Sequence, residues 1–124
     1  MNQRPLNPPS LSRYNKGQYY EQQARSFLEQ QGLLFVSANY RCRQGEIDLI
    51  MREHQTLVFV EVRYRASRDY GGALSSVTPA KQQKIRHTAR YFLLNQQINE
   101  AHQACRFDIV SYDDGQRSWL KNAF

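Results

Sequence analysis

The amino-acid sequence predicts one small α/β domain in which helices and strands follow the order αβββαβ, with a further short strand at the end. Its 124 residues, of which 40% are hydrophobic, fit a single domain with a modest core. Two segments of helical periodicity alternate with short apolar runs, and the two strongest runs are typical of strands covered on both faces. A mixed sheet flanked by helices is therefore expected over residues 17–124.

The composition narrows the class of partner. A net charge of +6 and a pI near 9.6 suit nucleic acid or an anionic membrane surface, although many small basic domains bind nothing specific. No stretch approaches the ~20 apolar residues of a membrane span, and the N-terminus lacks the apolar core of a secretory signal. We therefore expect a cytoplasmic protein in which Cys42 and Cys105, which have no metal-ligand spacing, are free thiols.

The N-terminal part changes from a tail to a helix. Residues 1–16 are rich in Pro, Asn, Ser and Arg and have no apolar period, which predicts a mobile basic tail. Within 17–31 the apolar positions recur at helical spacing, and Gly32 is a plausible stop. Glu21 falls at the edge of the apolar face, which consists of Tyr20, Ala24, Phe27, Leu28 and Gln31.

Three strands are expected in the next segment. The apolar run at 33–37 predicts a short strand, and the polar, basic residues 39–45 predict a loop. Residues 46–52 and 57–64 are the two strongest strands, because both are almost continuously apolar. The link at 53–56 is short enough to join them as a hairpin.

A second helix follows a loop at 65–77. Thr78 can cap this helix with its hydroxyl group, and Pro79 suits the first helical position. The pattern continues to about Asn95 and then gives way to a strand at 106–112 and a last short strand at 118–124. The expected buried stripe of the helix is Ile85, Ala89, Phe92 and Leu93, with Lys84, His87 and Arg90 on the far side.

The hairpin brings two carboxylates together. A turn centred on the 53–56 link places Asp48 opposite Glu61, and it places Glu46 opposite Arg63 on the same face. The opposite face then consists of three apolar pairs, which supports this register: Ile47 with Val62, Leu49 with Val60, and Met51 with Val58.

Opposed like charges destabilise a hairpin, so Asp48 and Glu61 need compensation. A divalent cation, a raised pKa on one carboxyl group or the basic neighbour Arg63 could each supply it. One interpretation is a buried ion network of these residues with Glu46. The other is a metal site, because oxygen ligands on adjacent strands suit Mg²⁺, which beside a phosphodiester polarises the phosphoryl oxygen and activates water.

The residues of this hairpin also resemble those of known families. The pattern D-x12-E-x-R, formed by Asp48, Glu61 and Arg63, resembles the PD-(D/E)XK nuclease superfamily, whose hairpin carries a metal-binding Asp and Glu followed by Lys. More narrowly, the chain resembles the YraN-type family of small bacterial proteins, which is similar to archaeal Holliday-junction resolvases. This resemblance covers roughly 14–124 and is carried by segments 17–24, 39–50, 59–63, 77–82, 106–108 and 122–124.

The resemblance implies a restriction-endonuclease-like core and a role for each matching residue. Asp48 and Glu61 would bind Mg²⁺ or Mn²⁺, helped by the carbonyl of Val62. Glu21 would reach the metal or its water from the first helix. Glu46 would support the site by pairing with Arg63, and a homodimer is implied by analogy with the resolvases alone.

Arg63 departs from the family pattern, which prefers Lys. An arginine is never deprotonated in practice, so Arg63 can stabilise charge but cannot act as a base. Two hypotheses follow: a Mg²⁺-dependent nuclease acting on branched or structured DNA, and a nucleic-acid-binding module that kept the fold but lost turnover. A purely structural interaction protein is a third class.

Basic residues with interleaved aromatics surround the expected site, and such sets track phosphates and stack on bases. Each of them taken alone could equally be a solvated surface charge. The expected partner is nucleic acid, with DNA favoured over RNA. The residues expected to contact it are Arg41, Arg43, Arg65, Arg68, Lys81 and Lys84.

Overall fold

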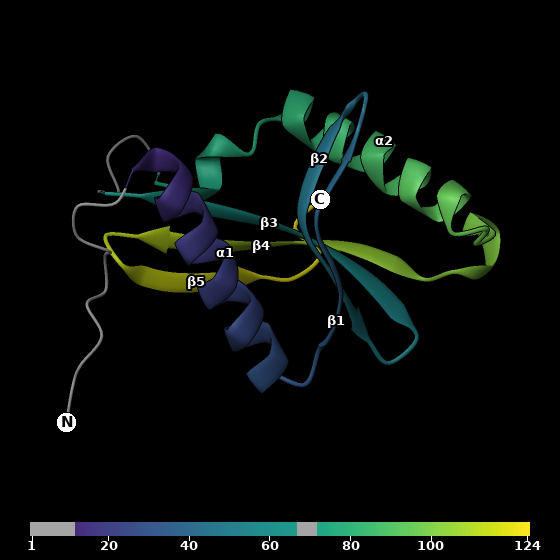
Figure 1. The fold of residues 1–124 in the computed structure, drawn as a ribbon, viewed down its shortest axis with the longest axis horizontal. Coiled ribbons are helices and arrows are strands. Elements are labelled where there is room, and N and C mark those ends of the chain that lie inside the picture. Colours follow the sequence, from purple (N-terminus) through teal and green to yellow (C-terminus); the bar gives the residue numbers. More distant parts are fainter. Residues whose placement is uncertain (1–11, 67–71) are drawn as a thin grey trace.

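The computed structural model describes residues 12–66 and 72–124 and has the predicted α/β architecture. A five-stranded sheet with the order β1-β2-β3-β4-β5 has one long helix on each face (Figure 1). The β3–β4 pair is parallel and the other neighbouring pairs are antiparallel, so the sheet is mixed, as expected. No helix in the described part of the chain is long and apolar enough to cross a bilayer.

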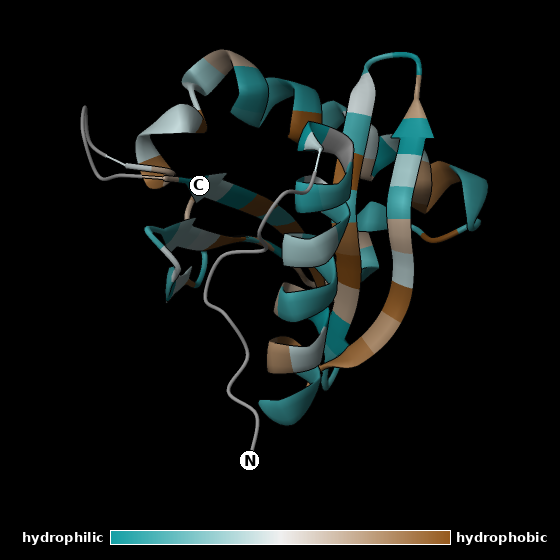
Figure 2. Cartoon of the chain, turned by 60° about the vertical axis from the view of Figure 1, so that its left-hand side comes forward, coloured by the Kyte–Doolittle hydropathy of each residue, from teal (hydrophilic) through white to brown (hydrophobic). Residues whose placement is uncertain are grey.

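Helix α1 (Arg13–Gln30) begins earlier than the sequence pattern indicated. Ser12 caps it, since its hydroxyl accepts a hydrogen bond from the Asn15 N–H at 3.2 Å, and this cap needs no apolar period. The last residues of the expected tail, 13–16, are therefore helical, whereas its residues 1–11 lie outside the described residues. The side of α1 that faces the viewer in Figure 2 is mostly hydrophilic, and its buried side presents Tyr20, Ala24 and Leu28 to the sheet.

The expected loop at 39–45 is wrong. Strand β1 (Leu34–Cys42) continues through most of it and pairs with β2 (Gly45–Glu53) across a tight turn. Strand β1 is an edge strand with one open side, so it tolerates polar residues that a central strand would not. A register shift interrupts the pairing between Phe35 and Ser37.

The hairpin of β2 and β3 (Thr56–Arg65) has the predicted register. Leu49 pairs with Val60 and Met51 with Val58. Their side chains pack toward α1 together with Val62. His54 in the turn has a φ of 55°, the left-handed conformation that tight hairpin turns require.

The pairing of β2 with β3 ends sooner than the sequence predicted, and Ile47 beyond it lies on the other side of the sheet than expected. Leu49 and Val60 are the last paired residues, while β2 continues to pair with β1 beyond them. The regular alternation between the two faces ends there. Ile47, which was expected beside Leu49, belongs instead to the cluster under α2 with Phe59.

Helix α2 (Pro79–Asn95) and the short helices η2 (Leu74–Ser76) and η3 (Glu100–His102) lie in the crossover from β3 to β4. The Thr78 hydroxyl accepts from the Lys81 N–H at 3.3 Å, so the predicted cap is confirmed. The predicted buried stripe of Ile85, Ala89, Phe92 and Leu93 is confirmed as well, with Thr88 added to it.

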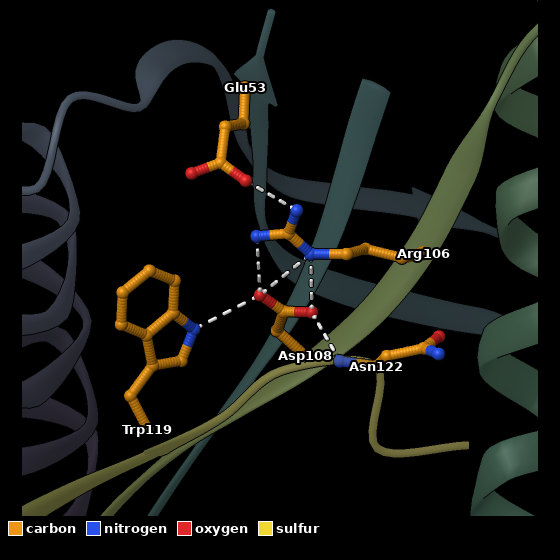
Figure 3. A network of polar contacts seen from close by, with 5 residues as sticks. All are labelled: Glu53, Arg106, Asp108, Trp119 and Asn122. Carbon is orange, nitrogen blue, oxygen red and sulfur yellow. Dashed lines mark hydrogen bonds and ion pairs between the residues drawn. The ribbon is translucent and has the colours of Figure 1, made fainter.

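A buried polar network ties the end of the chain to the sheet (Figure 3). Asp108 of β4 (Cys105–Asp113) is fully buried and accepts hydrogen bonds from Arg106 Nε at 3.0 Å and Trp119 Nε1 at 3.0 Å. It also accepts from the backbone N–H of Asn122 at 2.9 Å. Strand β5 (Gln116–Leu120) is therefore shorter than the predicted strand at 118–124, because the chain turns at Asn122 to reach Asp108.

Candidate functional site

Three carboxyl groups from three different elements meet where β2 leaves β3. The side chain of Asp48 on β2 lies in contact with the carboxyl groups of Glu21 on α1 and Glu61 on β3. The Val62 N–H, just beyond the last pair of the hairpin, donates to Asp48 Oδ2 at 2.8 Å. The structure thus brings together the Asp48–Glu61 pair that the hairpin register predicted, and adds Glu21 to it.

Burial and mutual repulsion hold protons on this cluster. Burial, followed by the charge of Asp48, raises the pKa of Glu61 from 4.5 to about 9. The same two causes raise the pKa of Glu21 from 4.5 to about 7. Burial also raises the pKa of Asp48, against the hydrogen bond from Val62 that lowers it. The three groups together form a site that favours an added positive charge.

Arg63 compensates one of these carboxyl groups. Its Nη2 atom lies 2.6 Å from Oε2 of Glu61, and both side chains are largely buried. Its Nε atom is buried and has no hydrogen-bond partner within the described ranges. Arg63 thus pairs with Glu61, the predicted metal ligand on its own strand, through one nitrogen of its guanidinium group.

The predicted pair of Glu46 and Arg63 is wrong. Glu46 forms an exposed ion pair with Arg41 Nε at 3.0 Å, because Arg41 is its direct partner in the β1–β2 pairing. The β2–β3 pairing, which would have placed it opposite Arg63, has ended before Glu46. Glu46 still lies close enough to raise the pKa values of Glu21 and Asp48 by repulsion.

The residues predicted to contact nucleic acid are exposed wherever the structure describes them. Arg68 lies outside the described residues. The charge of Lys81, in the first turn of α2, lowers the pKa of Glu61 against the larger effect of burial. Arg41, Arg43, Arg65, Lys81 and Lys84 are all exposed.

Asn39 is a residue of the site that the sequence indicated only as part of the matching segment 39–50, without a role. Its side chain donates a hydrogen bond to Glu21, which lowers the pKa of that carboxyl group against the larger effect of burial. The residue type gave no further signal, because an asparagine within a polar segment is equally typical of a loop. The contact depends on α1, which is distant in the sequence, and so no local pattern predicts it.

The raised pKa values predict a pH dependence of stability. Between about 4.5 and about 9 folded Glu61 retains a proton that the unfolded chain has lost, so the free energy of unfolding of the metal-free protein falls as pH rises. The slope for one proton is at most about 1.4 kcal/mol per pH unit. Urea unfolding across this range should show a shallower slope for Glu61→Gln and the parent slope for the exposed control Glu29→Gln. A parent stability that rises from neutral to alkaline pH would contradict this sign.

Comparison with known proteins gives consistent matches over most of the chain. A sequence profile described as uncharacterised protein family UPF0102 matches residues 20–112. A UPF0102 protein of Aeromonas hydrophila is 54% identical over 110 residues, which cover 89% of this chain and 85% of that protein. UPF0102 protein YraN of Escherichia fergusonii is 50% identical over 117 residues, or 94% of this chain and 89% of the relative. YraN of Salmonella newport is 49% identical over 114 residues, covering 92% and 87% of the two chains.

Proposed function

The chain belongs to the uncharacterised protein family UPF0102, and we propose that it is a nucleic-acid-binding protein of the endonuclease-like fold that cleaves branched or structured DNA with Mg²⁺ or Mn²⁺. The observation that carries this proposal is the contact of Asp48 with both Glu21 and Glu61 at the point where the hairpin opens. Three carboxyl groups held together at a cost in desolvation and repulsion need a reason, and a divalent cation supplies one.

The donor set fits a hard cation. Asp48 and Glu61 would hold it and Glu21 would bind the ion or its water, so all side-chain donors are carboxylate oxygens, which suit Mg²⁺ and Mn²⁺. Within 12–66 and 72–124 no group of three or more His, Cys, Asp or Glu side chains is arranged so that it could hold a metal ion by itself. An ion at Asp48 and Glu61 would therefore have to keep several waters as ligands, as Mg²⁺ usually does.

The chemistry would divide between the ion and the side chains. When bound, the cation would polarise a phosphoryl oxygen and lower the pKa of a water. Glu21, whose side chain lies beside Asp48, would accept a proton from that water. Arg63, two residues beyond Glu61, would stabilise negative charge that develops on the phosphorus centre.

The surface charge supports a polyanionic substrate. The chain carries a net charge of +6, and the exposed residues Arg43, Arg65 and Lys84 form no ion pair with another residue of the described ranges. Lys81 adds charge close to Glu61. These cations would position the phosphate backbone and leave the discrimination between DNA forms to shape.

A second candidate is a nucleic-acid-binding module with little or no turnover. The ion pair of Arg63 with Glu61 favours it, because a guanidinium group already occupies one face of a carboxylate that the metal would need. Both candidates include nucleic-acid binding, and they differ in whether the bound metal leads to cleavage.

Fluorescence anisotropy with labelled single-stranded, duplex, flapped and four-way DNA tests the shared part of the proposal. We expect binding that weakens with salt, by a slope of log K near −0.9 per neutralised phosphate on duplex DNA. Added Mn²⁺ should increase the DNA affinity of the parent protein and of the control Glu29→Gln, but not the DNA affinity of Asp48→Asn. Affinity that is absent at low salt, or a Mn²⁺ effect that survives in Asp48→Asn, would count against the proposal.

A further inference from the structure

Asn39 has a backbone conformation that is unusual for its place in the fold. Its φ is 54°, in the left-handed region that costs most side chains about 1–2 kcal/mol, and it lies in the middle of β1. The other described residues with positive φ that are not glycine lie in turns or just after helices: His54, Gln97, Asp114 and Asn122. Such a conformation within a strand persists only where the surroundings impose it, and it is often found at functional sites.

The surroundings of Asn39 contain the carboxylate cluster. Its side chain donates to Glu21, and Glu21 lies in contact with Asp48. Two hollows between α1 and β1, of about 360 Å³ and about 280 Å³, share Gln18, Glu21 and Asn39 in their linings. The Asn39–Glu21 contact thus lies where the two hollows meet, on a solvent-accessible side of the cluster.

We propose that Asn39 is a positioning residue that holds the Glu21 carboxylate beside Asp48, so that Glu21 serves as an oxygen donor to the metal or its water. This inference rests on the proposed function, because it assigns a role toward the same ion. Glu21 lies on helix α1, whereas Asp48 and Glu61 lie on strands of the sheet. The distance from the Glu21 carboxylate to the other two therefore depends on how α1 packs against the sheet. A hydrogen bond from the edge strand to Glu21 fixes that side chain relative to the sheet.

The choice of asparagine agrees with both requirements of the position. Asparagine tolerates left-handed φ better than most residues, and its amide supplies an N–H donor for a carboxylate. Glycine would satisfy the backbone without supplying the donor. The variant Asn39→Gly therefore removes the proposed positioning contact while it keeps, or relieves, the strained backbone.

The experiment measures the Mn²⁺ dissociation constant by electron paramagnetic resonance, together with the melting temperature, for the full-length protein. The variants are Asn39→Gly, Glu21→Gln and the two combined. Asn122→Gly is the matched control, because Asn122 has a similar φ of 52° and contacts Asp108 through its backbone N–H, which glycine retains.

We expect Asn39→Gly to weaken Mn²⁺ binding by about 10–100-fold, the usual effect of losing a residue that orients a metal ligand. Its melting temperature should be equal to that of the parent or higher. Asn122→Gly should leave Mn²⁺ binding unchanged. In the Glu21→Gln background the Asn39→Gly substitution should have no further effect, because both changes interrupt the same contact.

Two results would overturn the inference alone. One is parent-like Mn²⁺ affinity in Asn39→Gly, and the other is an equal loss in the presence and absence of Glu21, which would indicate a general structural defect. If instead the parent protein and Asp48→Asn bind Mn²⁺ equally, the metal site itself is wrong and the proposed function fails with the inference.

Discussion

Replacing Asp108 with alanine will lower the free energy of unfolding by about 3–5 kcal/mol, the usual effect of removing one partner from a buried ion pair. Asp108 is fully buried and accepts hydrogen bonds from Arg106, Trp119 and Asn122. Its loss leaves the Arg106 guanidinium, which is only 17% exposed, with Glu53 as its remaining partner. It also leaves the indole N–H of Trp119 and a backbone N–H without acceptors.

Urea unfolding followed by circular dichroism measures this loss. The control is Glu29→Ala, which removes one carboxylate from an exposed ion pair with Arg25 and should cost well under about 1 kcal/mol. Equal destabilisation by the two substitutions would show that the buried network contributes no more than a surface ion pair does. The carboxylate cluster is untouched in both variants, so this prediction is independent of the proposed function.

Replacing Arg63 with lysine is expected to increase the rate of Mg²⁺-dependent DNA cleavage by up to about 10²-fold. This is the gain expected if the rate of the natural protein is limited because the Arg63 guanidinium is directed at Glu61 and not at the phosphate. Arg63 Nη2 lies 2.6 Å from Glu61, so the guanidinium competes with a metal for that carboxylate. A lysine carries a single compact charge that can shift toward a phosphate. The substitution also removes the Nε atom of Arg63, which is buried without a hydrogen-bond partner among the residues that the structure describes.

Cleavage and melting temperature are to be measured on the same preparations of parent and Arg63→Lys protein, with single-stranded, duplex, flapped and four-way DNA. Asp48→Asn in the Arg63→Lys background identifies contaminating nuclease, since it should abolish all cleavage that belongs to the site. If Arg63→Lys lowers the melting temperature and cleaves none of the substrates, Arg63 is a clamp that offsets repulsion in the cluster. The binding-module candidate would then replace the nuclease.

The sequence was sufficient for the features that local patterns control. The β2–β3 register follows from a short turn and from apolar residues that must share a face, so the meeting of Asp48 and Glu61 was predictable. The cap and buried stripe of α2 follow from Thr78, Pro79 and helical periodicity.

The features that sequence patterns missed depend on contacts between distant elements. The β2–β3 pairing ends at Leu49 and Val60, and nothing in the sequence of either strand indicates this end. As a result Glu46 pairs with Arg41 and not with Arg63. The left-handed Asn39 and its contact with Glu21 require α1 to be in place. Asp108 was recognised as part of a matching motif, but its partners Trp119 and Asn122 could be identified only once the chain end folded back.

The parallel pairing of β3 with β4 has a consequence for the order of folding events. The β2–β3 hairpin closes over a two-residue turn, a step that isolated hairpins complete in about 1–10 μs. Residues 57–65 and 105–113 can pair only after the long intervening segment with α2 has been placed, which is a slower, high-contact-order step. Asp48 and Glu61 can therefore become neighbours early, while still hydrated, and their desolvation follows later as α1 and β4 close over the hairpin.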